Sequence, residues 1–279
     1  MKICYISDFL LSDIIGGGEL NDYELCSIIS ESIPVTKKRC RELTQADIEQ
    51  HTHFIISNFV TLSPTFIDYI TKNCKYIIYE HDHKYLANRN PCKFKNFKAP
   101  PSAIVHEQFY NSAIAVFCQS GFHQKIINKN IPEANVHNVS GNLWSLESLG
   151  IMRTLLQKEK KQAYSILNSR TAHKNTRAAL AYCEEKGYKS ELVSSNNYQE
   201  FLSLISNNQS FIFMPKTPET LSRVVVECKM MGMKILINKN VGASYEPWFA
   251  LKGAELIDYI ASKRQTIPNL VIKMLKDAA

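Results

Sequence analysis

The sequence lacks the features that mark a secreted, zinc-stabilised or membrane-spanning protein. It contains eight cysteines among 279 residues, but no CxxC pair of the kind that holds structural zinc. No apolar run approaches the ~20 residues that span a bilayer. The opening segment MKICYISDF is too short and too polar to be a secretory signal. These absences predict a reduced, cytoplasmic protein without a membrane span.

The ten glycines never adopt the G-x-G-x-x-G spacing, which counts against a dehydrogenase. A hydrophobic content of 45% supplies a core for one large domain or two small ones. The formal net charge of +7 favours an anionic partner, such as nucleic acid, an anionic lipid surface or a phosphorylated substrate. The same charge is also ordinary for a soluble enzyme, so it favours an anionic partner without establishing one.

Short apolar runs alternate with helix-like patterns along the first half of the chain. This alternation predicts an α/β fold with a mostly parallel sheet. The expected strands are 2–7, 53–59, 75–80 and 112–120, and the expected helices are 19–32, 65–73 and 121–130.

The alternation restarts after a charged segment, which predicts two Rossmann-like halves. We expect an N-terminal Rossmann-like domain at 1–145, a helical linker at 146–162 and a C-terminal Rossmann-like domain at 163–260. A short amphipathic helix within 261–279 is expected to pack back on a domain; a membrane-surface role is the weaker alternative.

The segment KTPETLSRVVVECKMMG places two glutamates eight positions apart, Glu219 before a predicted helix and Glu227 inside it. Ligands of parallel α/β sheets bind outside the carboxyl ends of strands. Thr220, Leu221 and Ser222 are expected to form the first helical turn, whose free N–H groups make a phosphate cradle. Two solvated helix acids are the simpler alternative.

With its flanking strand, Pro215 and Gly232, this E-x7-E segment resembles the donor-sugar motif of retaining glycosyltransferases with the GT-B fold, especially family 4. The resemblance implies two Rossmann-like domains with a donor cleft between them, an N-terminal acceptor domain at 1–145 and a C-terminal nucleotide-sugar-binding domain at 163–260. It implies a nucleotide-diphosphate sugar, such as a UDP-sugar, as donor and no metal cofactor. It also implies that Glu219 contacts the sugar and Glu227 the ribose.

A basic pair follows the first strand of the second half. Arg170 and Lys174 resemble the family's Gly-Arg…Lys-Gly segment, with Ser169 and Asn175 where glycines are usual. The resemblance implies that the pair holds the donor diphosphate and stabilises its charge as it departs. A solvated helix start is the alternative.

Two segments of the first half add to the resemblance. Gly16, Gly17, Gly18 and Glu19 resemble the family's Gly-Gly-Ala-Glu loop, whose backbone approaches the donor or acceptor. In the segment EHDHK, His81 matches a family histidine near the reaction centre, and His83 is the alternative match. Metal binding by these histidines is the rival interpretation, and we expect no metal site.

The segment 83–102 interleaves cations with aromatic residues, a composition that suits a nucleic-acid backbone and unstacked bases. The cations are Lys84, Arg89, Lys93, Lys95 and Lys98. This segment resembles bacteriophage-encoded glycosyltransferases, some of which modify hydroxymethylated pyrimidines in DNA. We therefore expect DNA as acceptor, within the host cytoplasm. The alternatives are a cell-surface or lipid-linked saccharide acceptor, and a non-catalytic protein that only binds sugar nucleotides.

Overall fold

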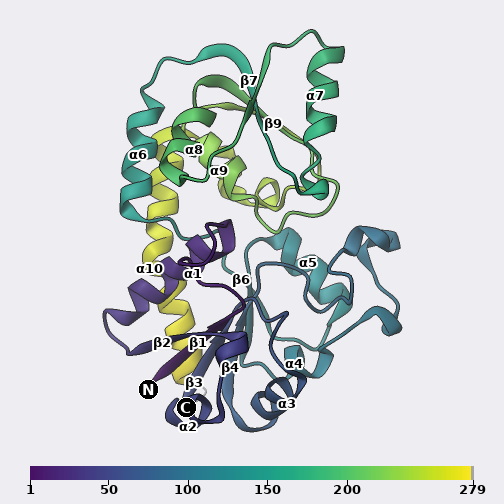
Figure 1. The fold of residues 1–279 in the computed structure, drawn as a ribbon, viewed down its shortest axis with the longest axis vertical. Helices are drawn as coiled ribbons and strands as arrows, with labels where there is room; N and C mark the ends of the chain where they lie inside the picture. Colours follow the sequence, from purple (N-terminus) through teal and green to yellow (C-terminus); the bar gives the residue numbers. More distant parts are fainter. Residues whose placement is uncertain (278–279) are drawn as a thin grey trace. The chain divides into compact units, whose positions relative to one another are not determined.

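A computed structural model describes residues 1–277 as two α/β units (Figure 1). The first unit comprises residues 1–143 together with residues from 263 onward, and the second comprises Trp144–Ser262. Each unit contains one fully parallel sheet, as the alternating sequence pattern predicts.

The first unit has a six-stranded sheet in the order β2-β1-β3-β4-β5-β6. Its strands are β1 (Ile3–Ser7), β2 (Val35–Arg39), β3 (His53–Ile56), β4 (Lys75–Tyr79), β5 (Ala115–Cys118) and β6 (Val136–Asn138). Its helices are α1 (Gly17–Ser30), α2 (Gln45–Gln50), α3 (Pro64–Asn73), α4 (Glu107–Asn111) and α5 (Gly121–Asn130), with the C-terminal part of α10 (Gly253–Asp277).

Alternate residues of each central strand enter two different cores. In β1, Cys4 and Ile6 join the core formed with α3, α4 and α5, whereas Ile3 and Tyr5 join the core formed with α1 and α10. This is the period-two alternation of a sheet covered on both faces.

The second unit has a four-stranded sheet in the order β10-β9-β7-β8. Its strands are β7 (Lys161–Leu167), β8 (Ser190–Val193), β9 (Asn208–Phe213) and β10 (Lys234–Ile237). Its helices are α6 (Leu146–Leu156), α7 (Thr176–Glu185), α8 (Tyr198–Ile205) and α9 (Arg223–Met230), with the N-terminal part of α10. Phe211 and Phe213 pack with α6, α8 and α9, whereas Ile212 packs on the other face with α7.

Two predicted segments differ from the structure. The segment 146–162, predicted as a linker, lies inside the second unit, where Leu149 and Met152 of α6 are buried in the core. The predicted C-terminal helix at 261–279 is the end of the longer helix α10, and Ile267, Val271 and Leu275 of it pack in the first unit. Residues 278–279 of that prediction lie outside the described residues.

Candidate functional site

Lys174 and Glu219 meet at the carboxyl ends of β7 and β9 in the second unit. The Lys174 ammonium donates to both carboxylate oxygens of Glu219, at 2.9 and 2.8 Å. The Lys174 side chain is 29% exposed and that of Glu219 is 12% exposed. The predicted diphosphate-binding cation and the predicted sugar-binding acid therefore lie side by side, at a place that solvent still reaches.

The backbone holds Glu219 firmly. Its N–H donates to the carbonyl of Asn240 at 2.7 Å, and its own carbonyl accepts from Gly242 at 2.9 Å. These bonds form a parallel bridge between Glu219 and Val241. The loop after β9 is thus tied to the loop after β10, which fixes the position of the carboxylate.

Asn175 occupies a position that the family reserves for glycine. Its φ is +60°, in the left-handed region that glycine adopts freely and asparagine tolerates better than most residues. Its side-chain amide donates to the carbonyl of Met214 at 2.8 Å. Asn175 therefore adopts the left-handed conformation and ties the loop after β7 to the end of β9. Arg170 lies earlier in the same loop and is exposed.

The predicted phosphate cradle begins later than expected. Thr220, Leu221 and Ser222 do not form a helical turn, because α9 begins at Arg223. Ser222 precedes the helix with a left-handed φ of +74°, and the Leu221 side chain is fully buried in the core. The start of the helix, where the cradle was predicted, is therefore shifted to Arg223, and the Val225 and Val226 amides donate to the Ser222 carbonyl.

Glu227 lies in a buried network instead of an open crevice. Its Oε1 accepts from Trp144 Nε1 at 2.9 Å and from the Tyr198 hydroxyl at 2.6 Å. Arg223 lies 3.6 Å from the same oxygen and stacks over the Trp144 ring, 4.1 Å from its centroid. A ribose hydroxyl would have to enter this network to reach Glu227. The sequence pattern did not indicate that the network exists.

His81 follows β4 in the first unit and is held by two side chains. Its Nε2 lies 2.5 Å from Asp22 Oδ1, and its Nδ1 contacts the side-chain amide of Gln119. Asp22 also accepts from Tyr5 and Ser57, at 2.5 and 2.6 Å. Both ring nitrogens of His81 are therefore engaged, and the ring is fixed in orientation. Sequence reasoning missed Asp22 and Gln119, which lie in α1 and directly after β5.

The glycine segment opens a helix, since α1 begins at Gly17. Gly18 lies against the His81 ring: a Cβ added there would be 3.7 Å from both His81 Cδ2 and Asn58 Nδ2. Gly18 and His81, two separately predicted site residues, are therefore neighbours in the first unit, and Gly17 precedes them at the start of α1.

Lys84, predicted to bind DNA, and His83, predicted to face the donor or the acceptor, are both buried, so their predicted contacts with DNA or the acceptor are wrong. The Lys84 ammonium pairs with Glu80 in the interior, and Tyr110 also donates to Glu80. His83 Nδ1 lies 2.8 Å from the Tyr85 hydroxyl. Burial, assisted by the Lys84 charge, lowers the pKa of His83 to about 3. Neither side chain can contact a macromolecule in solution.

The other cations of the basic segment are exposed, whereas its aromatic residues are buried or partly buried. Arg89, Lys93, Lys95 and Lys98 are exposed. Tyr85 is fully buried, and Phe94 and Phe97 pack against the core of the first unit. The segment therefore offers cations for phosphates, whereas Phe94 and Phe97 are only partly accessible for stacking with bases.

The chain matches no protein-family model and no curated protein sequence. Among solved structures it resembles HepE of Anabaena in complex with UDP and glucose, with 14% identity and a TM-score of 0.50; the match covers 100% of this chain and 98% of HepE. It also matches the lipopolysaccharide outer core galactosyltransferase WaaB, with 11% identity, a TM-score of 0.49 and coverage of 99% and 95%. The likeness to HepE shows that the chain has the GT-B fold, which confirms the predicted pair of Rossmann-like units.

None of the helices within residues 1–277 is both long and apolar enough to cross a bilayer.

Proposed function

We propose that the protein is a glycosyltransferase that moves a sugar from a nucleotide-diphosphate sugar to a hydroxyl acceptor. The observation that carries this proposal is the Lys174–Glu219 pair at the carboxyl ends of the strands of the second unit. The shared fold with HepE, whose structure contains UDP and glucose, favours a UDP-sugar as donor. The family 4 resemblance of the E-x7-E segment favours retention of configuration.

The chemistry needs positive charge where the diphosphate departs. The bond between the anomeric carbon and the diphosphate oxygen breaks, and a bond from that carbon to the acceptor oxygen forms. The acceptor proton passes to the departing diphosphate. Lys174 and the exposed Arg170 stabilise this anion, while Glu219 binds sugar hydroxyls and orients the ammonium of Lys174.

The donor half of the proposal is tested by calorimetry with UDP and UDP-glucose, followed by a UDP-release assay. Binding and turnover support a glycosyltransferase. Binding of the donor without turnover, across an acceptor panel, supports the non-catalytic sugar-nucleotide-binding alternative. Absence of binding to any nucleotide sugar would remove the proposal.

The acceptor prediction of hydroxymethylated pyrimidine in DNA is supported by the exposed cations Arg89, Lys93, Lys95 and Lys98. Each phosphate contact contributes a slope of about −0.9 in log affinity against log salt. Reversing the charge of Lys93 and Lys95 together should flatten the slope by about 1.8 and leave donor affinity unchanged. A salt-independent affinity in the wild type, without transfer to hydroxymethylated DNA, would favour the saccharide acceptor.

A further inference from the structure

The loop that carries Glu219 lacks two of its backbone donors. It runs from Met214, after β9, to Ser222, before α9, and Pro215 and Pro218 within it have no N–H group. With fewer N–H groups to form a turn of its own, the loop depends on neighbouring loops for its position. The loop after β10 provides these contacts.

Two partly buried asparagines of the loop after β10, Asn238 and Asn240, meet at a single carbonyl oxygen. Asn238 Nδ2 donates to the carbonyl of Pro215 at 2.9 Å, and Asn240 Nδ2 donates to the same oxygen at 3.0 Å. A carbonyl oxygen has two lone pairs, so this asparagine pair satisfies it fully. Asn238 Oδ1 also accepts from the Asn240 N–H at 3.0 Å, which fixes the two residues relative to each other. Since the carbonyl of Asn240 accepts from the Glu219 N–H, the pair holds this loop at Pro215 and at Glu219 itself.

The backbone around Lys174 is tied to the same loop. Before it, the carbonyl of His173 accepts a backbone N–H of the loop after β9 at 2.8 Å. After it, Asn175 Nδ2 donates to the carbonyl of Met214, also at 2.8 Å. The loop after β9 is therefore the common support of the cation and of the carboxylate that it contacts.

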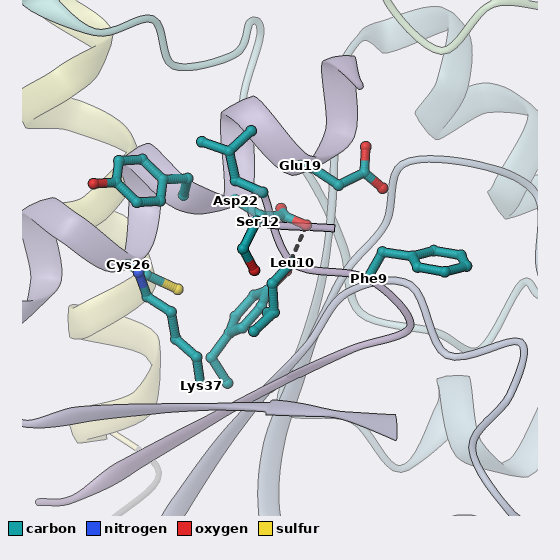
Figure 2. Close-up of a pocket in the computed structure, with 10 residues that line it drawn as sticks. Phe9, Leu10, Ser12, Glu19, Asp22, Cys26 and Lys37 are labelled. Atoms are coloured by element: carbon teal, nitrogen blue, oxygen red, sulfur yellow. Dashed lines mark hydrogen bonds between the residues drawn. The ribbon is translucent and has the colours of Figure 1, made fainter. Parts of the chain in front are cut away.

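The apolar pocket of the first unit has no comparable arrangement of accessible charges (Figure 2). It has a volume of about 380 Å³, and Phe9 from the loop after β1 and Tyr23 from α1 line it. Both oxygens of Asp22 already accept hydrogen bonds from within the protein, and Lys37 lies over the Tyr23 ring, 4.6 Å from its centroid. These charged groups are engaged within the first unit, whereas the cation–carboxylate pair of the second unit remains partly exposed to solvent.

We propose that Asn238 and Asn240 are positioning residues of the donor site, which hold the Glu219 carboxylate where it meets the sugar while Lys174 meets the diphosphate. The proposal rests on the proposed glycosyltransferase function and adds two residues to its site. The asparagine pair acts through Glu219, and a misplacement of about 1 Å in such a group can lower a rate about 10²-fold. Loss of the pair should therefore remove the affinity that the sugar adds and spare the affinity for the diphosphate.

The test measures the affinity that the sugar adds, as the ratio of the Kd of UDP to the Kd of UDP-glucose, by calorimetry on the full chain. Asn240→Ala removes one donor to Pro215 and should lower this ratio about tenfold, with the Kd of UDP within about twofold of wild type. Asn238→Ala is the second variant and should act alike, since it loses contacts to Pro215 and to Asn240. Asn73→Ala is the matched control, because this exposed asparagine of α3 also donates to a backbone carbonyl, that of Tyr69 at 2.9 Å, but lies in the first unit.

Hydrogen exchange followed by NMR tests the asparagine pair without any nucleotide. The Glu219 amide, which donates to Asn240, should exchange about tenfold faster in both variants of the pair than in wild type or in Asn73→Ala.

The outcomes separate this proposal from the function on which it rests. Unchanged exchange at Glu219, or an equal loss of affinity for UDP and UDP-glucose, would overturn the positioning role and leave the glycosyltransferase proposal intact. A wild type that binds UDP and UDP-glucose equally would overturn the contact between Glu219 and the sugar. Faster exchange in the variants of a chain that binds no nucleotide sugar would overturn the proposed function instead.

Discussion

Lys174 combines a partly exposed position with a two-point contact to a carboxylate, a combination that serves catalysis better than stability. Exposed ion pairs contribute ~0–1 kcal/mol to folding. A preorganised cation at a developing anion contributes far more to the transition state.

Lys174→Ala should therefore lower the transfer rate by a factor of about 10² or more and leave the free energy of unfolding within about 1 kcal/mol of wild type. Glu219→Ala should likewise reduce transfer while UDP alone still binds. Lys216→Ala, at an exposed lysine in the loop after β9, is the matched control. Wild-type turnover in Lys174→Ala would exclude this residue from the site.

Glu227 should contribute more to stability than to catalysis, because its carboxylate is buried and accepts hydrogen bonds from Trp144 and Tyr198. Glu227→Ala leaves both donors without this acceptor, at a cost of about 1–3 kcal/mol for each unsatisfied group. Glu227→Gln keeps one acceptor oxygen and should cost less.

Both tryptophans of the chain, Trp144 and Trp248, lie in the second unit, so urea unfolding followed by tryptophan fluorescence reports on this effect. Glu184→Ala, at an exposed glutamate of α7, should change the midpoint little. Equal midpoints for Glu227→Ala and Glu184→Ala would show that the buried network does not stabilise the unit.

At the scale of elements, periodicity predicted most helices and central strands because their apolar residues face a core. The predicted helix that contains Glu227 is α9 (Arg223–Met230), although it begins after Ser222, and the strand predicted at 75–80 is β4 (Lys75–Tyr79). Strand β2 (Val35–Arg39) escaped prediction because, at the sheet edge, its sequence VTKKR has no apolar run. The start of α10 was not predicted because Pro268, a residue type that is common at the first position of a helix, lies inside this helix.

The segment after β4 shows why the candidate site was only partly predictable. Its lysines look alike in sequence, yet Lys84 is buried against Glu80 while Lys93 is exposed. The difference arises from Glu80 at the end of β4, whose burial requires a cationic partner. The family resemblance assigned Lys174 and Glu219 to one donor site, and both follow strands of one parallel sheet. Neither the resemblance nor the spacing could reveal that Asp22 contacts His81.

Lys84→Met should cost about 3–5 kcal/mol of stability, because it leaves the Glu80 carboxylate buried without its cation. Lys93→Met, in the same segment, should change stability by less than about 0.5 kcal/mol. Thermal unfolding followed by circular dichroism compares the two variants. A double variant, Lys84→Met with Glu80→Gln, should recover part of the loss, since the uncompensated charge is gone.

At the scale of the whole molecule, the described chain divides its chemistry between two units with separate cores. The second carries the cation–carboxylate pair suited to a nucleotide sugar, and the first carries an apolar pocket and a buried polar cluster around His83. Because the polar cluster contains two histidines, it makes the stability of the first unit depend on pH.

His83 and His123 are both buried, with ring centroids 5.0 Å apart. His83 Nε2 and His123 Nδ1 lack hydrogen-bond partners in the described part of the chain. His123 Nε2 contacts the carbonyl of Asp82, and Lys84 adds positive charge nearby. Burial lowers the pKa of His83 to about 3 and that of His123 well below its usual value.

The unfolded chain therefore binds protons near the ordinary histidine pKa of about 6.5, whereas the folded chain does not. The resulting stability is complete above about pH 6.5 and is lost as pH falls toward the folded pKa, by up to about 1.4 kcal/mol per pH unit for each histidine. Urea unfolding followed by circular dichroism should show this decline between about pH 6.5 and pH 4. The double variant His83→Asn, His123→Asn should decline less steeply, whereas His173→Asn, at an exposed histidine of the second unit, should follow the wild type. Parallel declines in the wild type and the double variant would assign the acid sensitivity to other groups, since asparagine cannot take up the proton.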